Sequence, residues 1–246
     1  MTGDRAVSES LGFVLVFALV VTTTTAVFVL GMGGFEDRQR AERTANVERA
    51  FDVLADNLGD VRRYEDPSRA TEIRLSGGTL ALGDEVTVRV GVYDGGYVDE
   101  REFTLRPIVY RADGTEIAYE GGAVVRTDRG SGIVVSGPAF VDGDVVLPFV
   151  ATYADEGSTS VGGRDTVLVA AERGARASPE TFEPDAGEEV RVEIESPRAD
   201  AWADYFEDDD GFADVESSGD EVAATVETTG DDRVTLTRSY VAVEFR

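Results

Sequence analysis

The chain has 246 residues, of which 49 are acidic and 23 are basic, so its formal net charge is −26. It contains neither cysteine nor histidine, which excludes disulfide bonds, thiol nucleophiles, zinc sites built from those two residues and histidine acid–base relays. Such a negative surface repels the phosphate backbone, and we therefore expect no nucleic-acid partner.

All of the basic residues are arginines. An acidic surface without lysine is typical of halophilic proteins, because molar salt screens charges that lie more than about 3 Å apart. In dilute buffer the same charge would push the fold apart. We interpret the chain as halophilic; the alternative is an acidic surface that binds a ligand.

Residues 11–34 form a long apolar stretch without a charged side chain. As a helix with about 1.5 Å rise per residue, this stretch spans roughly 36 Å, enough to cross a hydrocarbon core of about 30 Å. A cleaved secretory signal is the alternative, but its apolar centre has only about 7–15 residues. The sequence predicts one transmembrane helix over residues 11–34, in contact with membrane lipid.

The tail before this helix, residues 1–10, contains Asp4-Arg5-Ala6 followed by Val7-Ser8. This arrangement, with the apolar helix behind it, resembles the N-terminus of type IV pilins and archaellins of halophilic archaea. The resemblance implies that a prepilin peptidase cuts between Ala6 and Val7, with Asp4, Arg5, Ala6 and Val7 as the processing residues. It also implies that the helix packs against other pilin-like subunits in a filament core. An uncleaved N-terminal anchor is the alternative.

The orientation in the membrane is contested by the charges on either side of the helix. Arg5 is the only basic residue before it, whereas four arginines follow it closely, namely Arg38, Arg40, Arg43 and Arg49. The positive-inside rule would place the C-terminal side in the cytoplasm, although long domains cross largely regardless of charge. The pilin resemblance instead implies that the C-terminal side is extracellular. We expect a single-pass protein of the cell membrane with an extracellular C-terminal domain.

Residues 36–64 continue the helical pattern as an amphipathic stalk helix. One apolar stripe recurs at intervals of three and four residues, formed by Val47, Phe51, Leu54, Leu58 and Val61. This packing seam either fixes the stalk on the chain's own β domain or forms a coiled-coil contact between subunits.

Residues 71–246 change to the period of a β-strand, most clearly where Val86, Val88, Val90 and Val92 alternate with other residues. Further short strands are expected at 72–75, 103–110, 116–119, 133–135, 145–152, 166–170, 190–195, 222–227, 233–237 and 241–245. Asp113-Gly114 is the clearest hairpin turn. The predicted fold is mainly β with an N-terminal α-helix, ending in an acidic, antiparallel, β-sandwich-like ectodomain.

A short helix is expected near 199–207, where Ala199, Trp202, Ala203 and Phe206 share one face. The face either packs on the sheet or presents an exposed aromatic anchor to a partner. The segments 117–123 and 200–206 also resemble an uncharacterised domain family of halophilic archaea, a resemblance that implies no activity.

The densest acidic run includes Asp208, Asp210 and Gly211, which faintly suggests a calcium loop but lacks the full EF-hand spacing. We expect no metal, no cofactor and no catalytic residue. The sequence favours a membrane-anchored, pilin-like cell-surface subunit with a structural or adhesion role. A permanently anchored extracellular module that binds a solute or a polysaccharide is the alternative, followed by an anchored hydrolase that uses carboxylates alone.

Overall fold

The computed structural model describes the backbone of residues 3–64, 66–140, 145–155, 157–228 and 233–246, with side chains except at 3–10, 29–37 and 176. The chain forms two compact units, Met1–Asn46 and Val47–Arg246, of which the second is called the β domain below. A β domain starting at residue 71 was expected. In the structure, the helical stripe from Val47 onward packs with the strands in one core of the second unit.

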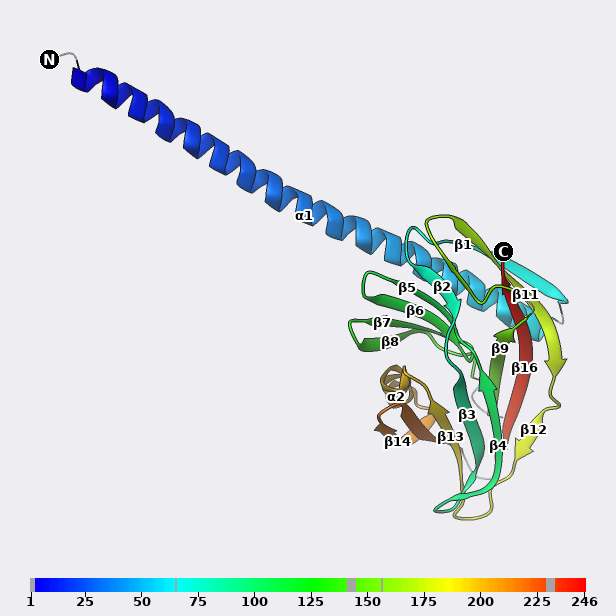
Figure 1. Cartoon of the computed structure of the whole chain (residues 1–246). Helices are drawn as coiled ribbons and strands as arrows, with labels where there is room; N and C mark the ends of the chain where they lie inside the picture. Colours follow the sequence, from blue (N-terminus) through cyan, green and yellow to red (C-terminus); the bar gives the residue numbers. More distant parts are fainter. Residues whose placement is uncertain (1–2, 65, 141–144, 156, 229–232) are drawn as a thin grey trace. The chain divides into compact units, whose positions relative to one another are not determined.

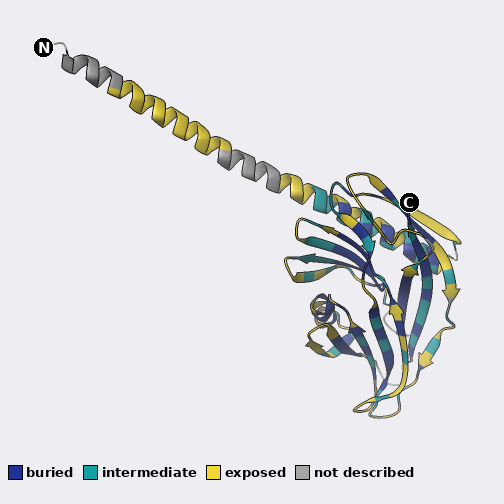
Figure 2. Cartoon of the chain, viewed as in Figure 1, coloured by how far each residue is buried: buried dark blue, intermediate teal, exposed yellow. Residues whose placement is uncertain are grey.

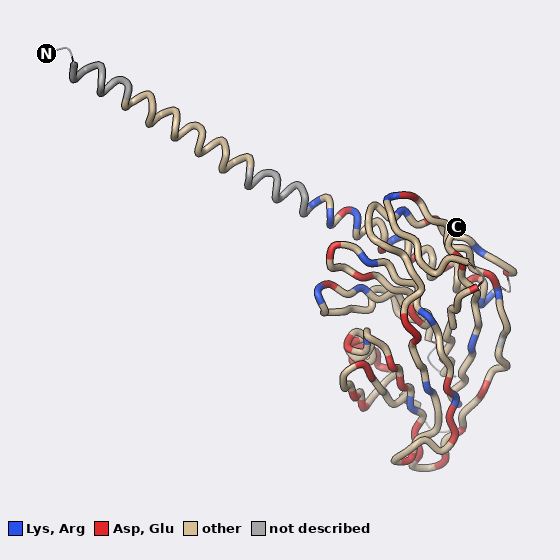
Figure 3. Tube along the Cα trace, in the orientation of Figure 1, with Lys and Arg blue, Asp and Glu red and all other residues tan. Residues whose placement is uncertain are grey.

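The helix α1 (Gly3–Arg63) joins the predicted membrane and stalk helices without a break. Its segment Leu11–Phe28 is long and apolar enough to cross a membrane once, and none of it is buried (Figures 2 and 3). The hydroxyls of Thr22 and Thr23 donate to the carbonyls of Ala18 and Leu19, at 2.7 and 2.9 Å. These polar side chains are therefore satisfied within the helix, as a lipid environment requires.

The described residues of the β domain form three sheets (Figure 1). The first sheet has the order β1 (Ser68–Arg74), β11 (Thr166–Arg176), β16 (Val234–Phe245) and β12 (Glu180–Phe182), with β9 (Val146–Ala154) also paired to β16. The second has the order β10 (Ser160–Gly162), β2 (Thr79–Leu82), β5 (Ile108–Ala112), β6 (Thr115–Glu120), β7 (Ala123–Asp128) and β8 (Ser131–Ser136). The third has the order β14 (Phe212–Ser218), β15 (Glu221–Val226), β13 (Glu189–Glu195), β3 (Val86–Tyr93) and β4 (Tyr97–Leu105).

The antiparallel, sandwich-like fold that the sequence predicts is confirmed, with one exception. Strands β9 and β16 pair in parallel, from Thr235 opposite Val146 to Val243 opposite Ala154. Parallel strands need a long connection, and here the chain from β10 to β15 supplies it.

The hairpin at Asp113-Gly114 is confirmed. It joins β5 to β6, with Ala112 paired to Thr115 and both turn residues at positive φ, +52° and +85°. These two positive values match the two-residue turn that suits the twist of a hairpin, and an Asp-Gly pair adopts it readily. A second Asp-Gly pair, Asp142-Gly143, also predicts a turn from the sequence, but it lies outside the described residues.

The prediction of a single strand over 103–110 is wrong. The chain leaves β4 after Leu105, and Pro107, which has no N–H to donate, precedes β5 in a different sheet. Between them the N–H of Arg106 donates to the carbonyl of Thr152 on β9 at 2.8 Å, so the crossing is held by a neighbouring strand. Conversely, the strands predicted at 233–237 and 241–245 are one strand, β16. Strands β2, β7, β10, β12 and β14 were not predicted.

The described part of the β domain has two apolar cores. One core encloses the α1 stripe of Val47, Phe51, Leu54, Leu58 and Val61, each at most 1% exposed, against the first and second sheets. The other lies under α2 (Ala199–Asp208), where Trp202 and Phe206 are fully buried. Both helical patterns are therefore used inside the chain, and burial of one such side chain contributes about 1.5–3 kcal/mol.

Candidate functional site

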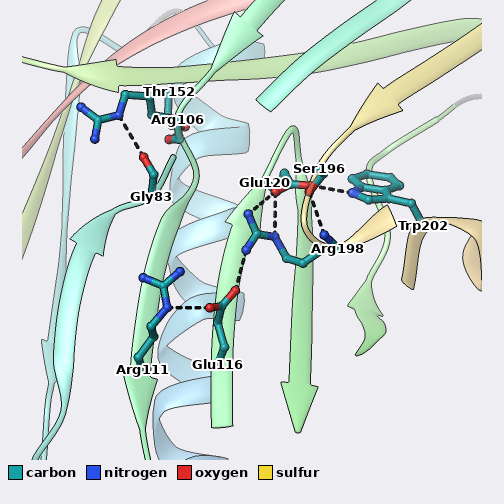
Figure 4. Close-up of polar contacts among 9 residues, drawn as sticks. All are labelled: Gly83, Arg106, Arg111, Glu116, Glu120, Thr152, Ser196, Arg198 and Trp202. Carbon is teal, nitrogen blue, oxygen red and sulfur yellow. Dashed lines mark hydrogen bonds and ion pairs between the residues drawn. The ribbon is translucent and has the colours of Figure 1, made fainter. Parts of the chain in front are cut away.

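Five side chains with charged or polar groups meet where the second sheet contacts the start of α2. We call Glu116, Glu120, Ser196, Arg198 and Trp202 the Glu120 cluster (Figure 4). The Glu120 and Arg198 side chains are 1% and 5% exposed, so a complete ion pair lies inside the domain. Charged groups are rarely buried to this degree unless they are paired, which makes the cluster the strongest candidate for a site.

The backbone on both sides of the cluster is shaped for it. Glu120 is the last residue of β6, and Gly121 and Gly122 turn the chain into β7 with φ of +66° and +120°. Such values are open to glycine at little cost. On the other side, the N–H of Arg198 donates to Ser196 Oγ at 3.1 Å as the chain enters α2.

All hydrogen-bonding positions of the Glu120 carboxylate are occupied. Its Oε1 accepts from Ser196 Oγ at 2.8 Å and from Trp202 Nε1 at 2.7 Å. Its Oε2 accepts from Arg198 Nε at 2.8 Å and lies 2.6 Å from Arg198 Nη2. The carboxylate thereby accepts from four donors, which occupy its roughly four lone-pair sites. It has no lone pair left to accept a proton from a substrate.

The cluster continues toward the surface through Arg198. Its Nη1 donates to Glu116 Oε1 at 2.5 Å, and Glu116 Oε2 in turn accepts from Arg111 Nε at 2.7 Å. Burial opposes the charged form of Arg198, but the carboxylates of Glu120 and Glu116 outweigh it and raise the pKa of the guanidinium above its usual value. Arg198 is thus held permanently charged, and the arrangement is suited to fastening α2 to β6 rather than to proton transfer.

A second charged network covers the outer face of the third sheet. Arg89 on β3 pairs with Glu193 on β13 and with Glu102 on β4, the latter at 2.8 Å, and its guanidinium lies 5.5 Å from the ring centre of Tyr97. Burial, with the nearby Glu193 carboxylate, raises the pKa of the Tyr97 hydroxyl. Burial also raises the pKa of Glu193, although Arg89 opposes this. These cross-strand pairs tie three strands together.

In the described part of the chain, two of the hollows lie away from Glu120 and Arg198. One, of about 290 Å³, is lined by the end of α1 at Arg62 and by Arg173, Gly174 and Ser239 beside the irregularity in the β11–β16 pairing. The other, of about 450 Å³, is an open depression between the β5–β6 and β7–β8 turns, with Arg129 on its rim. Arginines line both hollows, Arg62 and Arg173 in the first and Arg111 and Arg129 in the second.

The residues that the sequence suggested for processing and for metal binding are not part of the Glu120 cluster. The backbone of Asp4, Arg5, Ala6 and Val7 is helical, and their side chains lie outside the described part. Among the described residues, no group of three or more acidic side chains is placed to hold a metal ion, and Asp208 and Asp210 belong to no such group. Asp209 instead accepts a hydrogen bond from the N–H of Gly211 at 2.9 Å.

The Glu120 cluster was not predicted from the sequence, although two of its residues lie in segments that the sequence analysis singled out. The two segments 117–123 and 200–206, which resemble a haloarchaeal family, contain Glu120 and Trp202, and the structure brings the two side chains into contact. Trp202 is buried, so of the two readings of this helix the packed one is correct.

Comparisons with known proteins give a family but no activity. The model of a family of unknown function, DUF7289, matches residues 5–244. An uncharacterised protein of Archaeoglobus fulgidus is 37% identical over 79 residues, which cover 32% of this chain and 26% of that protein, so the chain spans about a quarter of that relative's length. The crystal structure of the ywiB protein from Bacillus subtilis aligns with 68% of this chain and 99% of that chain, at 9% identity and a TM-score of 0.19.

Proposed function

The chain belongs to the DUF7289 family, whose function is unknown. From its apolar N-terminal helix and its acidic β domain, we propose that it is a membrane-anchored, pilin-like subunit of the surface of a halophilic archaeon. The anchor is the α1 segment Leu11–Phe28 and the displayed part is the acidic β domain. Its role is structural or adhesive, and it performs no catalysis.

The observation that carries the proposal is the exposure of the apolar helix. Its large side chains are 46–72% exposed, from Val21 at the low end to Phe13 and Val27 at the high end. Burial of each such side chain contributes about 1.5–3 kcal/mol, and a bilayer can provide it along the whole segment. The hydroxyls of Thr22 and Thr23 are already bonded within the helix, which removes the main cost of placing them in lipid.

The internal bonding of the β domain supports a role without catalysis. Its most deeply buried charged pair, Glu120 and Arg198, is saturated by partners of the same chain. Such a pair specifies how α2 sits on the sheet, which suits a domain that must keep its shape at a cell surface.

Membrane fractionation tests the anchor. The full chain, expressed in a halophilic host and lysed in concentrated KCl, should sediment with membranes and dissolve in detergent. Replacing Leu15 and Val20 by arginine should shift it to the aqueous fraction, at a cost of about 2.5–3.5 kcal/mol per arginine at the helix centre. Val98→Arg on β4, at a residue that is 66% exposed, is the matched control and should stay in the membrane. An aqueous wild-type chain would refute the proposal.

Two further measurements test processing and orientation. Mass spectrometry of the purified chain should find Val7 at the mature N-terminus; an intact Met1 would remove the pilin-type processing and leave the anchor. Because the chain has no cysteine, Val98→Cys provides a single thiol on the β domain. A membrane-impermeant maleimide should label this thiol on intact cells as fully as after lysis, whereas labelling only after lysis would place the β domain in the cytoplasm.

The hollow at the end of α1 favours a second candidate function, an anchored module that binds a small anionic solute. Its volume of about 290 Å³ and its lining by Arg62, Arg173 and Ser239 support this. Calorimetric titration with organic anions should then give binding that Ser239→Leu abolishes and Val98→Leu does not.

A further inference from the structure

Four turns lie in a row at one end of the second sheet, and we call this end the turn end. The turns comprise residues 75–78, 113–114, 129–130 and 163–165. The N–H of Gly163 donates to the carbonyl of Gly78 at 3.2 Å, and a methyl group at Gly78 would lie 2.5 Å from the carbonyl oxygen of Arg111. The N–H of Arg129 donates to the carbonyl of Gly114 at 3.1 Å. The four turns therefore form one continuous surface.

Unpaired arginines gather at the turn end. In the described part of the β domain, four arginine side chains have no hydrogen bond or ion pair within the chain, namely Arg63, Arg74, Arg129 and Arg164. The last three are exposed and belong to the turn end, where Arg74 directly precedes the first turn and Arg164 lies in the fourth. In a chain with 49 acidic and 23 basic residues, three arginines without a carboxylate partner at one end point to a negative partner outside the chain.

Arg129 also has a backbone conformation that its side chain does not favour. It is the first of the two residues between Asp128 and Ser131, which pair across the β7–β8 hairpin, and its φ is +53°. Asn, Asp and Gly adopt this left-handed conformation more readily than a long side chain, and the neighbouring hairpin has Asp113 at the same place. An arginine held in this conformation points to a role beyond the turn itself.

The other turns of the domain carry acidic residues alone. Turns without an arginine are 94–96, 183–188, 209–211 and 219–220, and each contains aspartate or glutamate. At the turn end, the exposed acids Asp113 and Asp165 stand against the three exposed arginines. Two further carboxylates there, Glu116 and Asp128, are paired with arginines of the same sheet. The turn end is thus a surface on which arginines balance the acids of this strongly acidic chain (Figure 3).

The helix α1 enters the β domain at the turn end. Glu48, the second residue of the domain, is paired with Arg126 on β7 at 3.2 Å, three residues before the turn at 129–130. Arg62, near the end of α1, instead lines a hollow with Gly174, eight residues beyond the start of β11. Because β11 starts at the turn end, α1 runs from this end toward the opposite end of the domain.

The covalent connection between the anchor and the turn end is short. The apolar run ends at Gly34 and the β domain begins at Val47, 13 residues later on the same helix. At about 1.5 Å per residue this connection is about 20 Å long. The headgroup region occupies roughly 5–8 Å on each side of the hydrocarbon core. The turn at 129–130 lies about 10 Å beyond Arg126 at about 3.3 Å per residue. The connection therefore keeps the turn end within reach of the headgroups.

We propose that the turn end binds the phosphate groups of anionic membrane lipids through Arg74, Arg129 and Arg164. This inference rests on the membrane anchor of the proposed function. A guanidinium binds phosphate through paired, charge-assisted hydrogen bonds. Molar salt screens charges that lie more than about 3 Å apart, so it removes the repulsion between the acidic domain and the bilayer but leaves hydrogen-bonded contacts in place. The contact holds the β domain against the membrane with its acidic turns in solvent.

The full chain in nanodiscs provides the test, because the wild type has no cysteine. Ser131→Cys, directly after the turn at 129–130, carries a donor fluorophore, and the lipid headgroups carry the acceptor. Energy transfer then reports how closely the turn end approaches the bilayer. At the lowest KCl concentration that keeps the Trp202 fluorescence of the folded chain, discs of phosphatidylglycerol should give more transfer than discs of phosphatidylcholine.

Variants of the arginines give the decisive comparison. Arg129→Asn should shift the equilibrium between bound and detached domain roughly two- to fivefold toward the detached form, and adding Arg164→Gln should lower the transfer to that in phosphatidylcholine. Arg63→Gln, at an exposed and unpaired arginine near the opposite end, is the matched control and should change nothing. Because asparagine suits the left-handed position, Arg129→Asn should not lower the stability to urea, which separates lipid binding from folding.

The outcomes separate this inference from the anchor on which it rests. Equal transfer in the two lipids, or equal effects of Arg129→Asn and Arg63→Gln, would overturn lipid binding by the turn end and leave the anchor in place. A chain that stayed out of the discs would overturn both.

Discussion

Replacing Arg198 by leucine should destabilise the β domain by about 3–5 kcal/mol, because the change leaves the Glu120 carboxylate buried without its countercharge. The figure follows from the geometry. Two donors of Arg198 are within 2.8 Å of Glu120 Oε2, and a hydrogen bond to a charged group contributes about 1.5–3 kcal/mol. Ser196 and Trp202 would still bond Oε1, so the loss stays within this range.

The double variant Glu120→Leu with Arg198→Leu separates an unpaired charge from lost packing. Its loss of stability should be smaller than the sum of the two single losses by at least about 2 kcal/mol, because it leaves neither charge behind. Arg111→Leu is the matched control at the surface end of the same network. Its side chain is 53% exposed and bonds Glu116, so its effect should be about 0–1 kcal/mol.

Equilibrium unfolding in urea, measured on the full chain in detergent and concentrated KCl, gives these free energies. Trp202 is the sole tryptophan and its Nε1 bonds Glu120, so its fluorescence reports on the cluster itself. If Arg198→Leu cost no more than Arg111→Leu, or if the single losses simply added, the Glu120 cluster would not fasten α2 to the sheet.

Three other predictions use the same unfolding measurement. Leu54→Ala should cost about 2–5 kcal/mol because Leu54 is buried in the α1 stripe. The neighbouring Val53 is 53% exposed, so Val53→Ala should change the stability by no more than about 0.5 kcal/mol. Similar values for the two variants would show that the stripe is not part of the core. Gly91→Ala should cost at least about 1–3 kcal/mol, since its Cβ would lie 2.3 Å from a carbonyl oxygen of β4. The control Gly96→Ala, whose Cβ would have no atom within 4 Å, should be nearly neutral. A neutral Gly91→Ala would contradict the close approach of β3 and β4. Burial raises the pKa of Tyr97 above 10.0, so the folded state keeps a proton that the unfolded state releases, and the free energy of unfolding should fall as the pH rises above about 10. Tyr97→Phe should make this fall less steep. An unchanged slope would refute the assignment of the pH dependence to Tyr97.

Local patterns in the sequence determined the elements whose burial follows a simple period. The apolar run of residues 11–34, the stripe from Val47 to Val61 and the alternating valines of β3 each record one environment along a helix or strand, and the structure contains all three elements. Asp113-Gly114 likewise encodes its turn, because the required positive φ values are a property of those two residues.

The tertiary structure alone decided which elements meet. Glu120 and Arg198 are 78 residues apart, and 49 acidic residues offered no local reason to choose this one as the buried partner. The division of 103–110 between two sheets and the parallel pairing of β9 with β16 are also properties of distant neighbours. Periodicity reports which face of an element is buried, but a strand acquires its partner only when segments far apart in the chain are brought together, and no local window contains that information.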